Sequence, residues 1–529
     1  MSSFYIENFG CRATQADGAA IEQQFRDRGL ECAEAPARAD YVVLNTCAVT
    51  AAAEQDARRA IRRVLRSNPD CKILVTGCYA QRAPHEIAAL TGVSQVIGNS
   101  HKDTLAQIAL VRKSGSDISQ NREFIPVSDL ESGTSHSREG SLRTPREVPS
   151  GVRPAVPECR PDLRISAPPA QQRNLKATAA EACENLGHAE IFVSDIFAHT
   201  ELLAAPVFES SNERTRPNLK IQDGCNNRCS FCIIPSLRGR SRSLQIEDVL
   251  REVNELVAAG YREVVLSGIN LGRWGRDLSD VRRPGAFSHF ENVGIKVSSG
   301  HALPPRFEDL ICLILTYTSV EKLRISSVEP MDWTDRLIHL VAESPRIAKH
   351  AHVPMQSGSD RVLRRMHRKY RPWHYREKIE KIRAAMPDAA IGADVMVGFP
   401  GETDAEFEET RRMIQDLPFT YLHVFTFSAR PGTPAAAMGN QVPVNIARER
   451  NRVLRELGDK NKLNFMRRFI GRELEAITLN ITHEDGGSHW TEALTDNYLK
   501  MRVRGKQDPN QWLRTEVRAV EDGTLLAVG

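Results

Sequence analysis

The sequence predicts an α/β protein in three parts: an N-terminal parallel α/β domain of the Rossmann-like kind, a partial (β/α)6 barrel, and a small C-terminal β-barrel. Two regions in which strand-like and helix-like segments alternate predict the first two parts, because such alternation is typical of parallel sheets covered by helices. A run of short alternating strands near the C-terminal end predicts the third part. A chain of 529 residues agrees with several domains, since a single hydrophobic core stops growing well below that size.

The N-terminal domain is expected over residues 1–112, where the strand-like segments FYIENFG, YVVLNTC and KILVTGC alternate with helical ones. These segments lead into three cysteines, Cys11, Cys47 and Cys78, which we name the first triad. Because the carboxyl ends of parallel strands line one edge of a sheet, we expect the first triad to come together. The alternative is that the three thiols are buried at strand ends as small apolar groups.

Residues 113–190 are rich in Ser, Pro, Arg and Glu and poor in large apolar side chains. Such a composition buries too little apolar surface to offset the entropy of ordering, so we expect a disordered insertion or linker. Its cysteines, Cys159 and Cys183, are expected to be bystanders rather than ligands. A second polar, glycine-containing segment at about 281–304 is expected to be a loop insertion.

The partial barrel is expected over residues 191–442, followed by a basic helix at 443–470 and the C-terminal β-barrel at 471–529. Six strand-like segments alternate with helical ones in the first of these ranges. This number predicts an open or partial barrel rather than a closed eightfold one.

Charge and termini give weaker information. The net charge of +4, from 71 basic and 67 acidic residues, says little about partners. The N-terminus MSSFYIENFG lacks the basic and apolar regions of a secretory signal, and no apolar run approaches the ~18 residues of a membrane span. We therefore expect a cytoplasmic monomer without membrane contact. In such a protein, eleven cysteines favour metal or redox chemistry over a disulfide framework.

The strongest chemical signal is QDGCNNRCSFC, where Cys225, Cys229 and Cys232, named the second triad, follow the first predicted barrel strand. Zinc is the alternative, but a structural zinc site takes four ligands, and no fourth Cys or His lies nearby in sequence. A [4Fe-4S] cluster accepts thiolates at uneven short spacing. Three thiolates leave one iron free to bind a small molecule, which favours a reactive cluster.

The C-x3-C-x2-C spacing after the first barrel strand resembles the radical S-adenosylmethionine (SAM) superfamily. The resemblance implies that Cys225, Cys229 and Cys232 hold a [4Fe-4S] cluster. It further implies that the free iron binds SAM, which is cleaved reductively to a deoxyadenosyl radical.

The order of the parts also resembles the methylthiotransferases of that superfamily. Their N-terminal domain holds a further iron–sulfur cluster on three cysteines, which FGCRATQADG, NTCAVT and TGCYAQ match here. The resemblance implies a second [4Fe-4S] cluster on Cys11, Cys47 and Cys78. It also implies a division of labour, in which one cluster generates a substrate radical by hydrogen abstraction and the other presents sulfur. A second SAM then donates the methyl group.

This family has three substrate branches: threonylcarbamoyladenosine in tRNA, isopentenyladenosine in tRNA, and an aspartate of a ribosomal protein. The segment NTCAVTAAAEQDARRAIRR resembles the first, MtaB-type branch most closely, although CRATQ stands where many members have Lys-Val-Asn after the cysteine. The resemblance implies methylthiolation at C2 of the modified adenosine next to the anticodon. It also implies a sulfur source and an electron donor such as flavodoxin or ferredoxin. The alternatives are another branch of the family or a non-catalytic iron–sulfur RNA-binding protein.

Charge patterning supports tRNA as the partner, contacted at its anticodon stem–loop. Eight basic residues and one acidic residue lie between Arg361 and Lys378, with Tyr370, Trp373 and Tyr375 interleaved. Cationic groups neutralise phosphates, and aromatic faces stack on unpaired bases. The alternative is a solvated helix that covers the barrel.

Two further basic features have the same interpretation. Nine basic and three acidic residues lie between Arg448 and Arg472, and the C-terminal β-barrel resembles the RNA-binding TRAM domain. Arg238, Arg240 and Arg242 directly follow the second triad. They are expected to hold either a phosphate or the carboxylate of the cofactor.

Contacts to the SAM cofactor are expected at the carboxyl ends of the barrel strands. We predict them at Gly268, Asn270, Ser327, Glu329, Gln356 and Asp394. No side chain is expected to act as a catalytic acid or base, because a cofactor-centred radical needs none to abstract hydrogen.

Overall fold

The computed structural model describes residues 2–111, 189–199, 202, 215–278, 304–485 and 488–528. These residues belong to one compact unit that extends over 1–113 and 189–529. The expected insertion at 113–190 and the expected loop at 281–304 lie almost entirely outside the described residues, as do Cys159 and Cys183.

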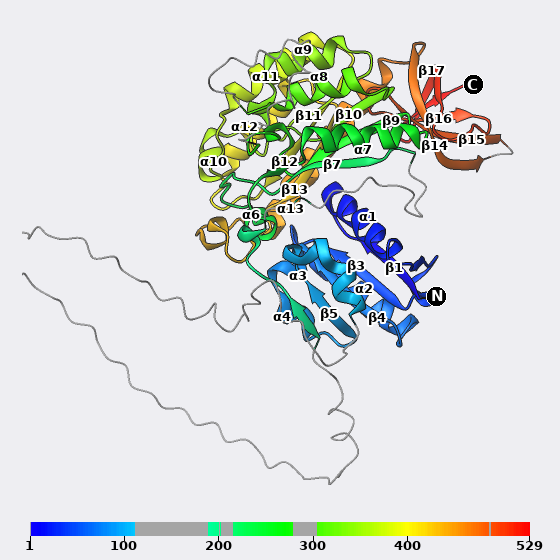
Figure 1. The fold of residues 1–529 in the computed structure, drawn as a ribbon. Helices are drawn as coiled ribbons and strands as arrows, with labels where there is room; N and C mark the ends of the chain where they lie inside the picture. Colours follow the sequence, from blue (N-terminus) through cyan, green and yellow to red (C-terminus); the bar gives the residue numbers. More distant parts are fainter. Residues whose placement is uncertain are drawn as a thin grey trace, which may run out of the picture. The chain divides into compact units, whose positions relative to one another are not determined.

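The N-terminal part is a six-stranded parallel sheet with the order β2-β1-β3-β4-β5-β6 (Figure 1). The strands are β1 (Ser3–Asn8), β2 (Glu31–Cys32), β3 (Tyr41–Thr46), β4 (Lys72–Gly77), β5 (Val93–Ile97) and β6 (Glu190–Phe192). The last strand comes from residues that the sequence assigned mostly to the barrel. It pairs with β5, so the chain returns to this sheet before it enters the barrel.

Helices cover both faces of this sheet, as the apolar pattern of β3 requires. The helices are α1 (Arg12–Arg26), α2 (Ala51–Ser67), α3 (Cys78–Arg82), α4 (Pro84–Ala88) and α5 (Leu105–Leu110). Val42 and Leu44 pack in a core with α2 and α4, whereas Val43 packs in a separate core with α1 and α5. A continuous apolar strand of this kind is typical of a parallel sheet buried on both sides.

The second part is a partial barrel of six parallel strands in two sheets, β10-β9-β7 and β11-β12-β13. The strands are β7 (Asn218–Asp223), β9 (Glu263–Gly268), β10 (Lys322–Ile325), β11 (His350–His352), β12 (Ala390–Val397) and β13 (Tyr421–Thr426). The short strand β8 (Arg242–Ser243) pairs antiparallel with β7. Isolated bridges, Leu323 with Ile347 and Ser327 with His352, join the two sheets.

Helices follow the barrel strands and form its outer layer (Figure 1). They are α6 (Ile234–Arg238), α7 (Ile246–Ala258), α8 (Phe307–Tyr317), α9 (Asp335–Glu343), α10 (Asp360–Arg365), α11 (Pro372–Ala385) and α12 (Asp404–Asp416). One large apolar core joins helices α7 through α12 to the strands and includes the fully buried Trp274 and Trp333, whereas Leu237 of α6 packs in a core of the N-terminal part.

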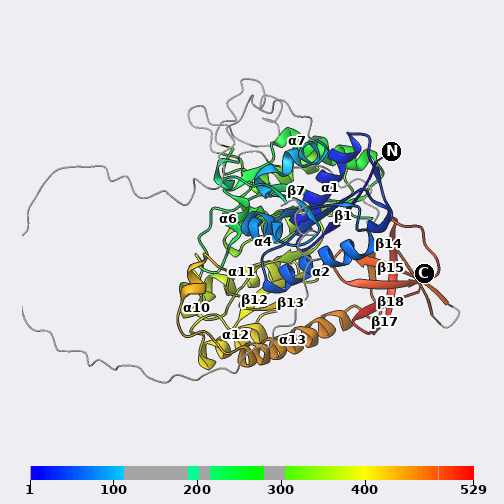
Figure 2. The ribbon, with the colours of Figure 1, turned by 90° about the horizontal axis from the view of Figure 1, so that it is seen from below.

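The long helix α13 (Val444–Arg467) leads into the C-terminal strands (Figure 2). These strands are β14 (Glu473–Asp485), β15 (Ser488–Thr495), β16 (Lys500–Arg504), β17 (Trp512–Glu521) and β18 (Thr524–Ala527), and they close into a barrel in the order β14-β15-β16-β18-β17. The predicted fold class is therefore confirmed. In the described part of the chain, no helix has both the length and the apolar character needed to cross a membrane.

Candidate metal centres

The second triad lies on a tight loop that follows β7. Gly224 has φ +68°, and a Cβ added there would lie 2.0 Å from the Arg240 carbonyl oxygen, so only glycine fits this turn. The Cys225 amide donates to the Gly239 carbonyl at 3.1 Å, which fixes the loop against the chain after α6. Burial raises the pKa of Cys232 to about 12, with smaller contributions from the neighbouring thiols of Cys229 and Cys225. The structure therefore brings these three thiols together.

Donors from other barrel segments point at two of these sulfur atoms. Asn270 Nδ2 donates to Cys225 Sγ at 3.6 Å, and Arg368 Nη1 donates to Cys229 Sγ at 3.2 Å. Glu329 forms an ion pair with the same guanidinium of Arg368. Hydrogen bonds of this kind favour thiolates and orient metal ligands. Asn270 and Glu329, two of the predicted cofactor residues, therefore lie at the second triad.

The first triad gathers at the ends of three different elements. Cys11 precedes α1, Cys47 follows β3, and Cys78 begins α3 directly after β4. A Cβ added at Gly10 would lie 2.7 Å from Cys47 Cβ, so the glycine allows Cys47 to pack against the turn before Cys11. Burial raises the pKa of Cys47 to about 11, and the thiols of Cys78 and Cys11 contribute to the rise. The convergence expected of parallel strand ends is thus present.

Each triad supplies three thiols, the type of ligand that a [4Fe-4S] cluster takes. Among the described residues, no group of three or more His, Cys, Asp or Glu side chains is arranged to hold a single metal ion. Asn99 Nδ2 lies 3.7 Å from Cys78 Sγ, so the first triad, like the second, has an amide donor directed at a sulfur atom.

A buried network of charges connects the two triads. Asp17 of α1 accepts from Lys102 Nζ at 2.8 Å and from Arg238 Nη2 at 2.9 Å, and it also pairs with Lys220 of β7. Arg238 Nη1 lies 3.0 Å from Asp223, the last residue of β7. The network thus joins the helix that follows Cys11 to the strand that precedes Cys225.

This network corrects the prediction for the arginines after the second triad. Arg238 is buried, and its two terminal amino groups, Nη1 and Nη2, pair with Asp223 and Asp17, so they are not available to a phosphate or to the cofactor. Arg242 is also buried, and it donates to the His199 carbonyl. The three arginines occupy every second position of the sequence from 238 to 242, but only Arg240 among them is exposed.

Removing the carboxylate from this network is expected to destabilise the fold. Burial alone would raise the pKa of Asp17, but the charges of Arg238, Lys102 and Lys220 outweigh it and hold the pKa well below its usual value of 3.8. Because the pKa is depressed on folding, the stabilisation is present above that value and is lost as the pH falls below it. Asp17→Asn should lower the free energy of unfolding by about 3–5 kcal/mol at neutral pH, since it leaves buried cations unpaired.

Urea unfolding of the full chain measures this effect, with Asp27→Asn as the matched control. Asp27 is exposed at the end of α1, so its replacement should change the unfolding midpoint little. Equal midpoints for the two variants would contradict the assigned role of Asp17.

The remaining predicted cofactor residues lie along the barrel strands. Gly268 ends β9, and a Cβ there would lie 2.9 Å from Gln222 Cβ. Ser327 forms a bridge with His352, and the Gln356 amide donates to the Asp394 carbonyl at 2.8 Å. None of these four predicted residues contacts a cysteine of the second triad among the described hydrogen bonds, so their cofactor role stays a prediction.

The basic segment between Arg361 and Lys378 differs from its expected form. Tyr370 and Tyr375 are 1% and 0% exposed, and their hydroxyls donate to backbone carbonyls of the barrel. The prediction that they stack on bases is therefore wrong, and Trp373, which is 57% exposed, is the one aromatic side chain of that set left on the surface. Tyr375 falls on the apolar face of α11 with Ile379 and Ile382, and Tyr370 is buried in the segment that precedes this helix.

The same segment yielded a contact that the sequence did not reveal. Arg368 belongs to the segment of predicted phosphate-binding cations, but it contacts Cys229 and pairs with Glu329. In the sequence, this contact is indicated only by a glutamate at the end of a strand and by a run of arginines. Neither feature shows that Arg368 pairs with Glu329 or contacts Cys229.

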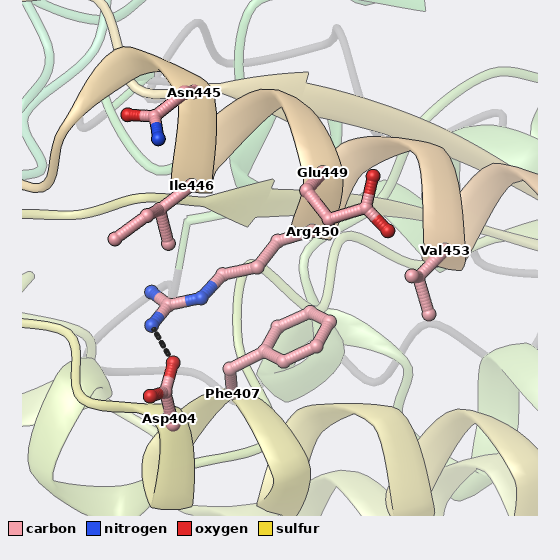
Figure 3. A pocket seen from close by; sticks show the side chains of 7 residues that line it. All are labelled: Asp404, Phe407, Asn445, Ile446, Glu449, Arg450 and Val453. Carbon is pink, nitrogen blue, oxygen red and sulfur yellow. Dashed lines mark hydrogen bonds and ion pairs between the residues drawn. The ribbon is translucent and has the colours of Figure 1, made fainter.

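The second basic segment is partly neutralised on α13. A pocket of about 370 Å³ lies between α12 and α13. Figure 3 shows Arg450 pointing to Asp404 among the side chains that line it. Arg450 pairs with Asp404 at 2.7 Å and with Glu402 at 2.6 Å, so it is not available to phosphates. Arg448 and Arg455 are exposed and form no ion pair with any described residue, which leaves part of the predicted phosphate track.

Comparisons with known proteins match the two parts of the chain in which the triads lie. Residues 219–414 match the Radical SAM superfamily, and residues 3–98 match Uncharacterized protein family UPF0004. The chain is 33% identical to the threonylcarbamoyladenosine tRNA methylthiotransferase MtaB of Bacillus subtilis, over 96% of this chain and 92% of that protein. It is 32% identical to the MtaB of Treponema pallidum, over 99% of this chain and 100% of that protein.

A relative with another substrate is similar as well. The tRNA-2-methylthio-N(6)-dimethylallyladenosine synthase of Thermobifida fusca is 31% identical over 90% of this chain and 77% of that protein. The superfamily implies SAM and a [4Fe-4S] cluster, which the thiols and donors at the second triad fit. The chain is a radical SAM enzyme and belongs to the MtaB-type methylthiotransferase family.

Proposed function

We propose that this enzyme converts N6-threonylcarbamoyladenosine, next to the anticodon of tRNA, into its 2-methylthio derivative. The observation that carries the proposal is the presence of two separate thiol triads, each with an amide donor directed at a sulfur atom. Methylthiolation of an unactivated C–H bond needs both radical generation and a sulfur carrier. The names of the MtaB relatives, similar along nearly the whole chain, support this substrate.

Under this proposal, the six cysteines hold two [4Fe-4S] clusters. The cluster on Cys225, Cys229 and Cys232 supplies, together with SAM, the radical chemistry. Arg368 and Asn270 orient this triad through their hydrogen bonds to sulfur. Glu329, in turn, fixes the guanidinium of Arg368.

The first triad is proposed to hold the cluster that presents sulfur. Cys11, Cys47 and Cys78 lie at the carboxyl edge of a parallel sheet, where such architectures bind ligands. The buried charge network around Asp17 fixes α1, and with it the position of Cys11, against β7. The chain thereby holds the two triads in a defined relation.

The proposed reaction needs further partners. An electron donor such as flavodoxin or ferredoxin would supply the electron for SAM cleavage, and a separate sulfur source would restore the donated atom. The exposed Trp373, Arg448 and Arg455 and the C-terminal β-barrel are proposed to contact the anticodon stem–loop. A tRNA substrate places the reaction in the cytoplasm, where we propose that the enzyme acts as a monomer.

Analysis of tRNA nucleosides tests the proposal. Deleting the gene should remove 2-methylthio-threonylcarbamoyladenosine from hydrolysed tRNA and leave its unmethylthiolated precursor, as measured by liquid chromatography and mass spectrometry. Complementation with the wild-type chain should restore the nucleoside. Unchanged levels of this nucleoside with loss of 2-methylthio-isopentenyladenosine would assign the enzyme to the branch of the Thermobifida relative. Unchanged tRNA would exclude both assignments and favour a ribosomal protein as substrate.

A further inference from the structure

Three strands of the barrel present one open face. Asp394 of β12 pairs in register with His423 of β13, and Met396 pairs with Phe425. Because alternate residues of a strand share a face, these side chains lie on the same side of the sheet. The opposite side of β13 is covered by α13, because a Cβ added at Gly458 of α13 would lie 3.3 Å from Leu422 Cβ.

The exposure of these side chains shows that no described part of the chain covers this face completely. Phe425 is 47% exposed and His423 is exposed, although β13 lies in the barrel. On β12, Asp394 and Met396 are partly exposed, while Ala393 and Val395 on the other face are buried. Aromatic groups that stay accessible inside a barrel indicate a binding site.

A cluster of rings forms one end of this face. Tyr421 lies in the space left by Gly392, where an added Cβ would lie 2.1 Å from the tyrosine ring. The Tyr421 ring stacks with His352 at 6.0 Å between centroids and meets His423 edge-on at 5.3 Å. We name His352, Asp394, Tyr421, His423 and Phe425 the inner wall.

Arg12 places a positive charge near the end of the inner wall that carries the Tyr421 ring. Its Nη2 donates to the Tyr498 hydroxyl at 3.1 Å, and the Tyr498 ring lies 5.9 Å from that of Tyr421. The guanidinium therefore lies close to the wall.

Arg12 is partly buried and has no carboxylate partner among the described residues. Arg238 and Arg324 are each paired with buried carboxylates, whereas no described Asp or Glu lies within 4.0 Å of the Arg12 guanidinium. Its one side-chain partner, Tyr498, is neutral and has φ +67°, a conformation that costs energy in any residue except glycine. A partly buried guanidinium with a neutral partner is suited to an incoming anion.

Contacts near both ends of β13 lead to residues that adjoin cysteines of the first triad. Arg12 directly follows Cys11 at one end. Beyond the other end of β13, Arg430 donates to the carbonyl of Ala48, the residue after Cys47, at 3.2 Å. A ligand on the wall would therefore lie next to the proposed sulfur-presenting centre.

We propose that Arg12 binds the carboxylate of the threonylcarbamoyl group while the inner wall holds the purine of the same nucleoside. A guanidinium matches a carboxylate with two parallel hydrogen bonds, and aromatic faces stack on a flipped base. This inference rests on the proposed function, because it needs a substrate with a carboxylate. Arg12 then selects this nucleoside over isopentenyladenosine, whose side chain carries no charge.

Binding of short RNAs to the full-length protein tests the inference. The probes are anticodon stem–loops that carry threonylcarbamoyladenosine, the same nucleoside with its carboxylate converted to an amide, or unmodified adenosine. Fluorescence anisotropy at fixed salt gives the affinities of the wild type, Arg12→Gln and Arg12→Lys. Arg28→Gln is the matched control, because Arg28 is exposed just after the same helix and donates to the Gln24 carbonyl.

The wild type and Arg28→Gln should bind the carboxylate probe about 10- to 100-fold more tightly than the amide probe. Arg12→Gln should bind both probes equally, and Arg12→Lys should keep part of the preference. Iron content equal to that of the wild type shows that Arg12→Gln retains both clusters, including the one proposed at Cys11. A full wild-type preference in Arg12→Gln would overturn the role of Arg12 alone. A wild type that binds all three probes equally would overturn the proposed substrate and, with it, this inference.

Discussion

Cys232→Ala is expected to abolish the reductive cleavage of SAM. Cys232 is the last of three thiols that lie together after β7, and two thiolates do not hold a cluster with a single free iron. The iron content of anaerobically reconstituted protein should fall by about four atoms, the content of one [4Fe-4S] cluster. Deoxyadenosine formed with a chemical reductant, separated by chromatography, measures the loss, which should reach the level of a reaction without enzyme.

Cys312→Ala is the matched control for this experiment. Cys312 lies on α8 and belongs to neither triad, so its replacement should leave both the iron content and deoxyadenosine formation unchanged. Cleavage of SAM at the wild-type rate by Cys232→Ala would remove the second triad from the mechanism.

Cys47→Ala is expected to separate the two halves of the reaction. Cys47 lies among the thiols of Cys11 and Cys78 and forms no described contact with the second triad. The variant should therefore still produce deoxyadenosine, while methylthio transfer to tRNA falls below detection. Its iron content should also fall by about four atoms. Parallel assays of deoxyadenosine and of the methylthiolated nucleoside in the same reaction measure this separation.

Cys71→Ala serves as the control in the same domain. Cys71 is buried, and its thiol donates to the Asn68 carbonyl rather than facing the first triad. Its replacement should preserve both activities. Loss of deoxyadenosine formation together with methylthio transfer in Cys47→Ala would contradict the division of labour between the triads.

The convergence of the cysteines was predictable because the topology of a parallel sheet determines which strand ends lie side by side. Cys47 and Cys78 follow strands that any βαβ alternation places side by side, so their convergence follows from topology alone. Asn270 and Glu329 were predictable for the same reason, since loops at the carboxyl ends of barrel strands surround one site. Spacing along the chain was therefore sufficient to predict that residues which follow neighbouring strands lie close together.

Partners distant in sequence were not predictable in the same way. Arg238 looked like a free cation beside the second triad, but its partner Asp17 lies 221 residues away in the N-terminal domain. Tyr370 and Tyr375 looked like stacking platforms, because the sequence of a basic segment does not show which of its side chains are buried. The environment of Arg12 depends on Tyr498 in the C-terminal β-barrel, 486 residues away, which no local pattern reveals.

The central claim is that each thiol triad holds its own [4Fe-4S] cluster. Iron and acid-labile sulfide counts with Mössbauer spectra of the anaerobically purified wild-type chain test it most directly. The account predicts about eight irons and eight sulfides per chain, all in cubane clusters. Zinc at either triad, or about four irons in a chain that still methylthiolates tRNA, would contradict it.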